Sequence, residues 1–183
     1  MLAQYVILGL LMERPMHGYE IKQRFERISG LFWKVSYGSL YPALKKLAES
    51  GYIIQQISAD LGAPERKVFH LTHLGSDALF AWLREAPVQE SVDRNSTNEF
   101  LLRLIFFSWL SPEEAREILV SRRKRLEDKW LEVVGKSHEI RSRSDRDYYK
   151  SAMYDYIIRA IQTEKKWLDD VLAGKEMPGS WKV

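Results

Sequence analysis

The stretch of residues 38–53, GSLYPALKKLAESGYI, constrains the fold more than any other part of the chain. Its leucines recur at the intervals of an amphipathic α-helix. Pro42 falls in the first turn, where proline is tolerated, and Gly51 follows the last turn, where a glycine commonly ends a helix. Because the β-like run Tyr52–Ile54 comes directly afterwards, we expect a helix over residues 38–50 that leads at once into a strand.

Two further helices are predicted before this one. Residues Ala3–Met12 are apolar on nearly every face, as in a helix packed on several sides, and Pro15 ends the run. A turn at residues 17–19 leads into a second helix, which carries its apolar residues on one face and which we expect to stop at Gly30.

A β-hairpin is predicted after the third helix. The runs Tyr52–Ile54 and Val68–Leu71 flank a polar, turn-forming connection at residues 58–64. Thr72 can cap the next helix, which has Trp82 on its apolar side. Three helices followed by a hairpin is the order of a winged helix-turn-helix, with the hairpin as the wing. We therefore expect a mainly α fold with a small β-hairpin.

The second half of the chain is helical in pattern. Residues 87–98 are almost free of apolar side chains, which indicates a linker. We expect a short helix at residues 100–109, a long one that Ser111 caps and that breaks at residues 142–147, and a last one that stops at Gly174. The predicted organisation is a winged helix-turn-helix domain at 1–86, a linker at 87–98 and an α-helical dimerisation domain at 99–183.

The outward face of the third predicted helix favours contact with DNA. A small, polar and aromatic N-terminal end can approach base edges, and lysines farther along can reach phosphates. The same face also fits a helix that only faces solvent. The residues concerned are Gly38, Ser39, Tyr41, Pro42, Lys45, Lys46 and Glu49.

The predicted wing carries a second basic site. Arg66 and Lys67 follow its turn, and a basic wing can lie along the phosphate backbone or in the minor groove. A solvated turn accounts for these residues equally well. Taken together, however, the helix and the wing place positive charge at the two positions where this architecture meets DNA.

Net charge alone does not decide the function. The chain has 28 Lys and Arg against 25 Asp and Glu, and the resulting +3 is too small to indicate nucleic-acid binding. The absence of cysteine excludes a disulfide scaffold, a thiolate zinc site and a thiol nucleophile. The start of the chain has no basic leader, and no apolar run approaches the ~20 residues of a membrane span. We therefore expect a soluble, cytoplasmic protein with no membrane partner.

Three motifs now identify a family. HGYEI at residues 17–21, GSLYPALKKLAESGYI at residues 38–53 and PERKVFHLTHLG at residues 64–75 resemble the PadR family of bacterial transcriptional regulators. The resemblance covers about residues 3–85. The helical second half, including the stretch MYDYIIRAIQTEKKWL, resembles the C-terminal dimerisation domain of the longer PadR-type proteins, which include virulence activators.

The resemblance implies a homodimer that binds a pseudo-palindromic operator in double-stranded DNA, usually as a repressor. It also implies which residues face the DNA on the second helix, on the third helix and on the wing. These residues are Tyr19, Lys22, Ser36, Tyr37, Ser39, Tyr41, Pro42, Lys45, Lys46, Arg66 and Lys67.

We expect the helices of residues 99–173 to hold the dimer, because wide aromatic and aliphatic stripes are costly to leave in water. The resemblance further implies a small aromatic effector stacked between aromatic side chains at this interface. Core and dimer packing account for the same aromatic residues, and we favour that explanation. The predicted interface residues are Phe100, Leu104, Leu119, Leu126, Trp130, Tyr156, Ile157, Ile161, Trp167 and Leu168.

An enzyme and a protein-binding module are the alternatives to a DNA-binding protein. An enzyme would need clustered polar groups, whereas the carboxylates here sit in first turns of helices or beside basic residues, so we expect no catalytic residue. His70 and His73 have no third ligand nearby, and we expect neither a metal nor a cofactor. A winged helix that binds only protein remains an alternative. Separately, Tyr19, Tyr37 and Tyr41 could each pack in the core instead of contacting DNA.

Overall fold

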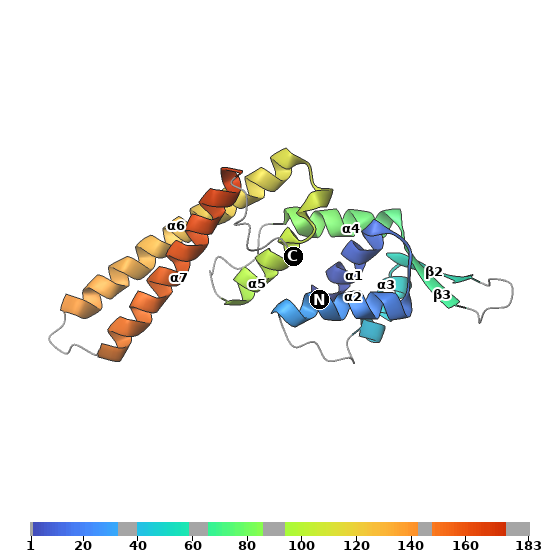
Figure 1. The fold of residues 1–183 in the computed structure, drawn as a ribbon, viewed down its shortest axis with the longest axis horizontal. Helices are drawn as coiled ribbons and strands as arrows, with labels where there is room; N and C mark the ends of the chain where they lie inside the picture. Colours follow the sequence, from blue (N-terminus) through green and yellow to red (C-terminus); the bar gives the residue numbers. More distant parts are fainter. Residues whose placement is uncertain (1, 33–39, 59–65, 86–93, 143–147, 175–183) are drawn as a thin grey trace. The chain divides into compact units, whose positions relative to one another are not determined.

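The computed structural model describes residues 2–32, 40–58, 66–85, 94–142 and 148–174. The contacts divide the chain into two compact units, residues 1–85 with 98–109 and residues 86–97 with 110–183, and each is described by itself. The predicted mainly α fold with a small β-hairpin is confirmed. The elements, labelled in Figure 1, are α1 Leu2–Glu13, β1 Met16–His17, α2 Gly18–Phe32, α3 Leu40–Glu49, β2 Ile53–Ser58, β3 Arg66–Leu71, α4 His73–Arg84, α5 Arg94–Leu104, a 3₁₀ helix Phe107–Trp109, α6 Pro112–Ser142 and α7 Tyr148–Leu172.

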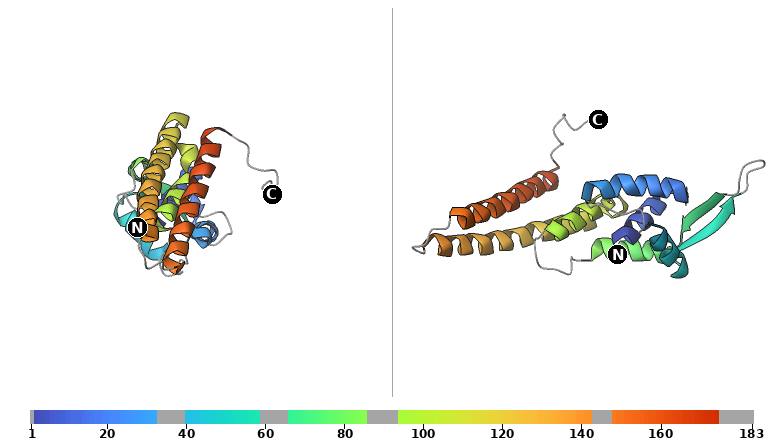
Figure 2. Two further views of the ribbon diagram at one scale, coloured as in Figure 1. Left: turned by 90° about the vertical axis from the view of Figure 1, so that its left-hand side faces the viewer. Right: turned by 90° about the horizontal axis from the view of Figure 1, so that it is seen from below.

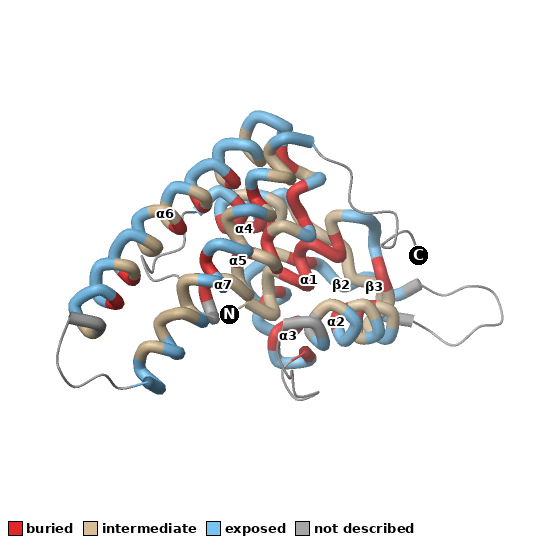
Figure 3. The backbone as a smooth tube through the Cα atoms, turned by 60° about the vertical axis from the view of Figure 1, so that its left-hand side comes forward, coloured by how far each residue is buried: buried red, intermediate tan, exposed pale blue. Residues whose placement is uncertain are grey.

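Helix α1 is the centre of the first unit. Its residues from Val6 to Leu11 are all buried, and the helix contacts α2, α3 and α4. Figure 3 shows this burial along the middle of the helix. A helix packed on several sides must be apolar all round, which explains why its sequence lacks an amphipathic pattern.

Helix α2 is longer than predicted. Ile21 and Phe25 are buried on one face, as expected, but the helix continues past Gly30 to Phe32. The expected stop at Gly30 is therefore wrong. The backbone of Gly30 does not have the positive φ of a glycine cap, and no atom lies within 4 Å of the position that a Cβ on this residue would occupy. An isolated glycine within a helix weakens it without ending it.

Helix α3 ends as its sequence predicts. Gly51 has a φ of 72° and donates its N–H to the carbonyl of Ala48 at 3.0 Å. The N–H of Tyr52 reaches the carbonyl of Leu47 at 2.9 Å. These two bonds form a Schellman motif, which satisfies the last carbonyls of the helix and turns the chain into β2.

The hairpin belongs to a three-stranded antiparallel sheet in the order β1-β3-β2. Strands β2 and β3 pair from Ile53 opposite Leu71 to Ser58 opposite Arg66, so both extend farther than predicted. The short strand β1 pairs with Phe69 and Val68 of β3 and was not predicted. In Figure 1 the hairpin extends beyond the helices of its unit.

Thr72 joins the hairpin to α4. Its hydroxyl accepts the N–H of Gly75 at 3.1 Å, as predicted for an N-cap, and donates to the carbonyl of Gly51 at 2.8 Å. One side chain therefore starts α4 and ties it to the turn after α3. This bond helps to hold the hairpin against the helices.

The predicted linker is helical from Arg94 onward, because its polar residues find partners that periodicity does not reveal. Ser96 is buried, and Thr97 accepts a hydrogen bond at 2.9 Å from Arg122 of α6. The prediction of a single helix at residues 100–109 is wrong as well. In the structure α5 ends at Leu104, and a 3₁₀ helix follows at Phe107–Trp109.

The second unit is built on the paired helices α6 and α7, which lie side by side in both views of Figure 2. Helix α6 begins with the predicted cap: Ser111 Oγ accepts the N–H of Glu114 at 3.2 Å, and the Glu114 carboxylate accepts the N–H of Ser111 at 3.0 Å. Leu126 and Leu168 are fully buried on the facing sides. Gly174, with a φ of 66°, stands after α7 as expected.

Candidate nucleic-acid interface

The exposed face of α3 carries the residues that sequence periodicity assigned to it. Leu40, Leu44 and Leu47 are buried, whereas Pro42, Lys45 and Lys46 lie on the exposed side. Tyr41 is 62% exposed and so is not a core residue. This separation follows from the helical period, which places positions 40, 44 and 47 on one side.

Helix α2 presents its N-terminal residues beside α3. Tyr19 is 68% exposed, which excludes a core role for this ring as well. Lys22 is partly buried and lies 4.0 Å from the carboxylate of Glu26. Tyr19 and Tyr41 line the same concavity, so the structure brings together two tyrosines that are distant in the sequence.

This concavity has a volume of about 890 Å³ and lies between α2, α3 and the sheet. Lys45 contributes from α3 and Lys67 from β3, so the structure joins the predicted basic residues of helix and wing in one surface. The remaining lining residues were not predicted to belong to the site, although Gln55 and Phe69 share a face with Lys67 by the alternation of paired strands. The full lining is His17, Gly18, Tyr19, Glu20, Tyr41, Leu44, Lys45, Ala48, Glu49, Gln55, Lys67 and Phe69.

The cations of this surface differ in their partners. Lys45 lies 3.7 Å from Glu49 one turn later, and both side chains are strongly exposed, so the pair is weak. Lys46 and Lys67 form no ion pair with any other residue that the structure describes. Binding of a phosphate to either ammonium group would therefore break no ion pair with a described residue.

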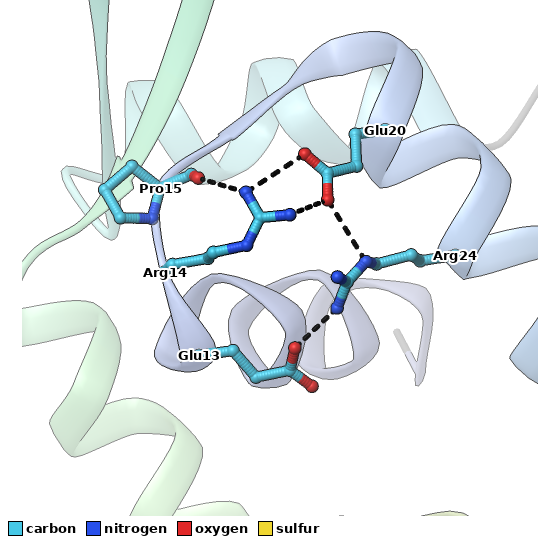
Figure 4. A network of polar contacts seen from close by, with 5 residues as sticks. All are labelled: Glu13, Arg14, Pro15, Glu20 and Arg24. Carbon is cyan, nitrogen blue, oxygen red and sulfur yellow. Dashed lines mark hydrogen bonds and ion pairs between the residues drawn. The ribbon is translucent and has the colours of Figure 1, made fainter.

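An ion-pair network fixes the start of α2 (Figure 4). Arg14 forms a two-pronged pair with Glu20, and its Nη1–Oε2 bond measures 3.2 Å. Arg24 contacts Glu20 at 3.2 Å and also pairs with Glu13 of α1. The network connects α1, the following turn and the first turns of α2, where Tyr19 precedes Glu20. Sequence analysis did not find it.

Some predicted DNA-facing residues cannot be placed. Ser36, Tyr37 and Ser39 lie outside the described residues. Arg66 lies on β3, where its backbone pairs with Ser58, but its side chain is not described. Their roles stay predictions.

The predicted interface residues lie in both units. Phe100, Leu119, Leu126, Ile161 and Leu168 are buried by their own chain, and Tyr156 is 73% exposed. The others, namely Leu104, Trp130, Ile157 and Trp167, are half-buried. Their place in a dimer stays a prediction.

The described part of the chain offers no other obvious chemistry. It contains no group of three or more His, Asp or Glu side chains that could hold a metal ion. None of its described helices is long and apolar enough to cross a membrane.

Three helices, a hairpin and an exposed basic face on the third helix define a winged helix-turn-helix DNA-binding protein. Residues 7–81 match the transcriptional regulator PadR-like family, and residues 97–174 match the virulence activator alpha C-terminal domain. The chain belongs to the PadR family of transcriptional regulators. This is a family of regulators and not of enzymes.

One relative and two of its crystal structures illustrate the relationship. The negative transcriptional regulator PadR of Bacillus subtilis (strain 168) is 29% identical over 177 residues, or 93% of this chain and 95% of that protein. The crystal structure of B. subtilis PadR in complex with operator DNA matches at 28% identity over 93% and 96% of the two chains, with a TM-score of 0.42. The structure of the same protein in complex with p-coumaric acid matches at 28% identity over 94% and 98%, with a TM-score of 0.43.

Proposed function

We propose that this chain is a homodimeric repressor that binds a pseudo-palindromic operator. The observation that carries the proposal is the single surface formed by Tyr19, Tyr41, Lys45 and Lys67 from three different elements. The name of the B. subtilis relative, a negative regulator, supports repression as the sign of control.

The N-terminal end of α3 would read base edges in the major groove, where Tyr41 is an exposed side chain of the first turn. Lys45, Lys46 and Lys67 would contact phosphates, which supply affinity and register. A dimer would place two α3 helices in successive major grooves, about 34 Å apart. Bound protein would then exclude polymerase from the promoter.

A stripe on α7 supports the homodimer. Tyr149, Met153 and Tyr156 share one face at helical spacing and are 81%, 49% and 73% exposed. A second copy that covers this face would remove it from water. Tyr156→Ala should therefore shift the chain toward monomer in sedimentation, whereas Gln162→Ala, on the opposite side of α7, should not. A wild-type chain that is monomeric at every concentration would contradict the proposal.

Phosphate contact is tested by salt dependence. Lys46→Ala should weaken binding to every duplex and lower the slope of log affinity against log salt by about one. Lys166→Ala, which removes an exposed lysine from α7, is the matched control and should leave the slope unchanged. Absence of salt-dependent binding by the wild-type protein would favour the alternative, a winged helix that binds only protein.

The small aromatic effector stays a prediction from the resemblance.

A further inference from the structure

The hairpin carries an exposed apolar residue on the side that faces the concavity. Ile57 of β2 is 62% exposed and lies directly opposite Lys67 of β3. Opposed residues in an antiparallel pair have their Cβ atoms within about 5.5 Å, so the two side chains share one patch of surface.

Strand alternation decides which way Ile57 points. Gln55 and Ile57 lie on the same face of β2, and their partners Phe69 and Lys67 lie on the same face of β3. Gln55, Lys67 and Phe69 all line the concavity that Tyr41 also lines. Ile57 therefore lies on the DNA-side face of the hairpin, beyond the concavity and toward the tip.

Ile54 serves as an internal comparison. It lies on the same strand, is also β-branched and is 47% exposed. Its position three residues earlier places it on the opposite face of the hairpin. Strand propensity explains both isoleucines equally, so a difference in their effect on DNA binding would come from the face that each occupies.

We propose that Ile57 packs into the minor groove and makes the wing select A·T pairs. This inference rests on the proposed DNA-binding function. In the minor groove A·T and T·A present only acceptors, whereas guanine adds the N2 amino donor. An isoleucine cannot accept a hydrogen bond, so a guanine beneath it would have its amino group desolvated without a partner. Lys67 beside it would hold the phosphates at the groove edge.

The test uses a duplex that the wild-type protein selects from a randomised pool. Each A·T pair in its flanking minor grooves is replaced by G·C and, separately, by inosine·C, which keeps the major-groove edge of G·C but lacks the minor-groove amino group. At the pairs beneath the wing, G·C should lower wild-type affinity about tenfold, and inosine·C should restore it.

Variants identify the residue responsible. Ile57→Ala should reduce the G·C penalty to less than about threefold, with an unchanged salt slope because no cation is lost. Ile57→Asn should remove the G·C penalty, because the side-chain carbonyl of asparagine can accept a hydrogen bond from the guanine amino group. Ile54→Ala should keep the full penalty. Circular dichroism should show all three variants folded.

Two results would overturn the inference. One is an equal penalty for G·C and inosine·C, which would place the readout in the major groove. The other is a loss of affinity on G·C replacement that is as large in Ile57→Ala as in the wild type. That result would assign the A·T preference to groove width and the basic residues. Both require that the wild-type protein binds the duplex, whereas absence of all binding would instead contradict the proposed function.

Discussion

The guanidinium of Arg122 in α6 is buried and donates its Nε–H to the carboxylate of Glu164 in α7 at 2.9 Å. Its Nη2 lies 2.8 Å from the same carboxylate and 2.9 Å from the hydroxyl of Thr97. A single charged side chain thus joins the start of α5 to both long helices of the second unit.

Loss of the partner carboxylate should destabilise this unit. Glu164→Ala removes the carboxylate that pairs with the buried guanidinium of Arg122 and leaves the hydrogen bond to Thr97, and breaking a buried ion pair in this way costs about 3–5 kcal/mol. Asp155→Ala removes the partner of Arg159 in an exposed pair of α7 and should change stability little. Urea denaturation of both variants measures the difference. An equal free energy of unfolding in the two variants would show that the buried pair does not stabilise the fold more than the exposed pair does.

Two glycines of the first unit should respond oppositely to alanine. A Cβ at Gly75 would lie 2.1 Å from the backbone carbonyl oxygen of Tyr52, so Gly75→Ala should destabilise by roughly 1–3 kcal/mol. Gly30 is helical with open space around it, and Gly30→Ala should stabilise by about 0.5–1 kcal/mol. Thermal denaturation followed by circular dichroism gives both values. A stabilising Gly75→Ala would contradict the packing at the start of α4.

Glu132 should titrate at unusually low pH. Hydrogen bonds from Lys136 and then Lys129 lower its pKa from 4.5 to about 2. Because the folded-state pKa is the lower one, the stabilisation is present above pH 4.5 and is lost as the pH falls toward 2. NMR titration of the carboxyl carbon measures this pKa directly, and Lys136→Gln should raise it. A pKa near 4.5 in the wild-type protein would show that these exposed pairs do not persist in solution.

Elements with local signals could be predicted from sequence. The caps at Thr72 and Ser111 and the glycine at position 51 depend on residues at most a few positions away, and the structure shows all three. The exposed face of α3, with Tyr41 and Lys45, follows from helical period alone.

Elements with distant partners could not be predicted. Strand β1 exists because Met16 meets Phe69 across the sheet, and α5 starts early because Thr97 meets Arg122. The hydrophobic pattern of α6 also predicts that Arg122, a charged residue, faces solvent, whereas its side chain is buried. The concavity needs residues from α2, α3 and β3 at once, so only its separate parts were visible in the sequence.

If α3 contacts base edges, the wild-type protein and Tyr41→Ala should differ in how strongly they discriminate between two duplexes. A fragment selected from the source genome is compared with a shuffled duplex of the same composition, for wild type and for Tyr41→Ala. We predict that the wild type prefers the selected duplex by about 10³-fold or more and that Tyr41→Ala weakens this preference while affinity for the shuffled duplex is unchanged. Equal wild-type affinity for both duplexes, or equal losses on both in Tyr41→Ala, would contradict the claim.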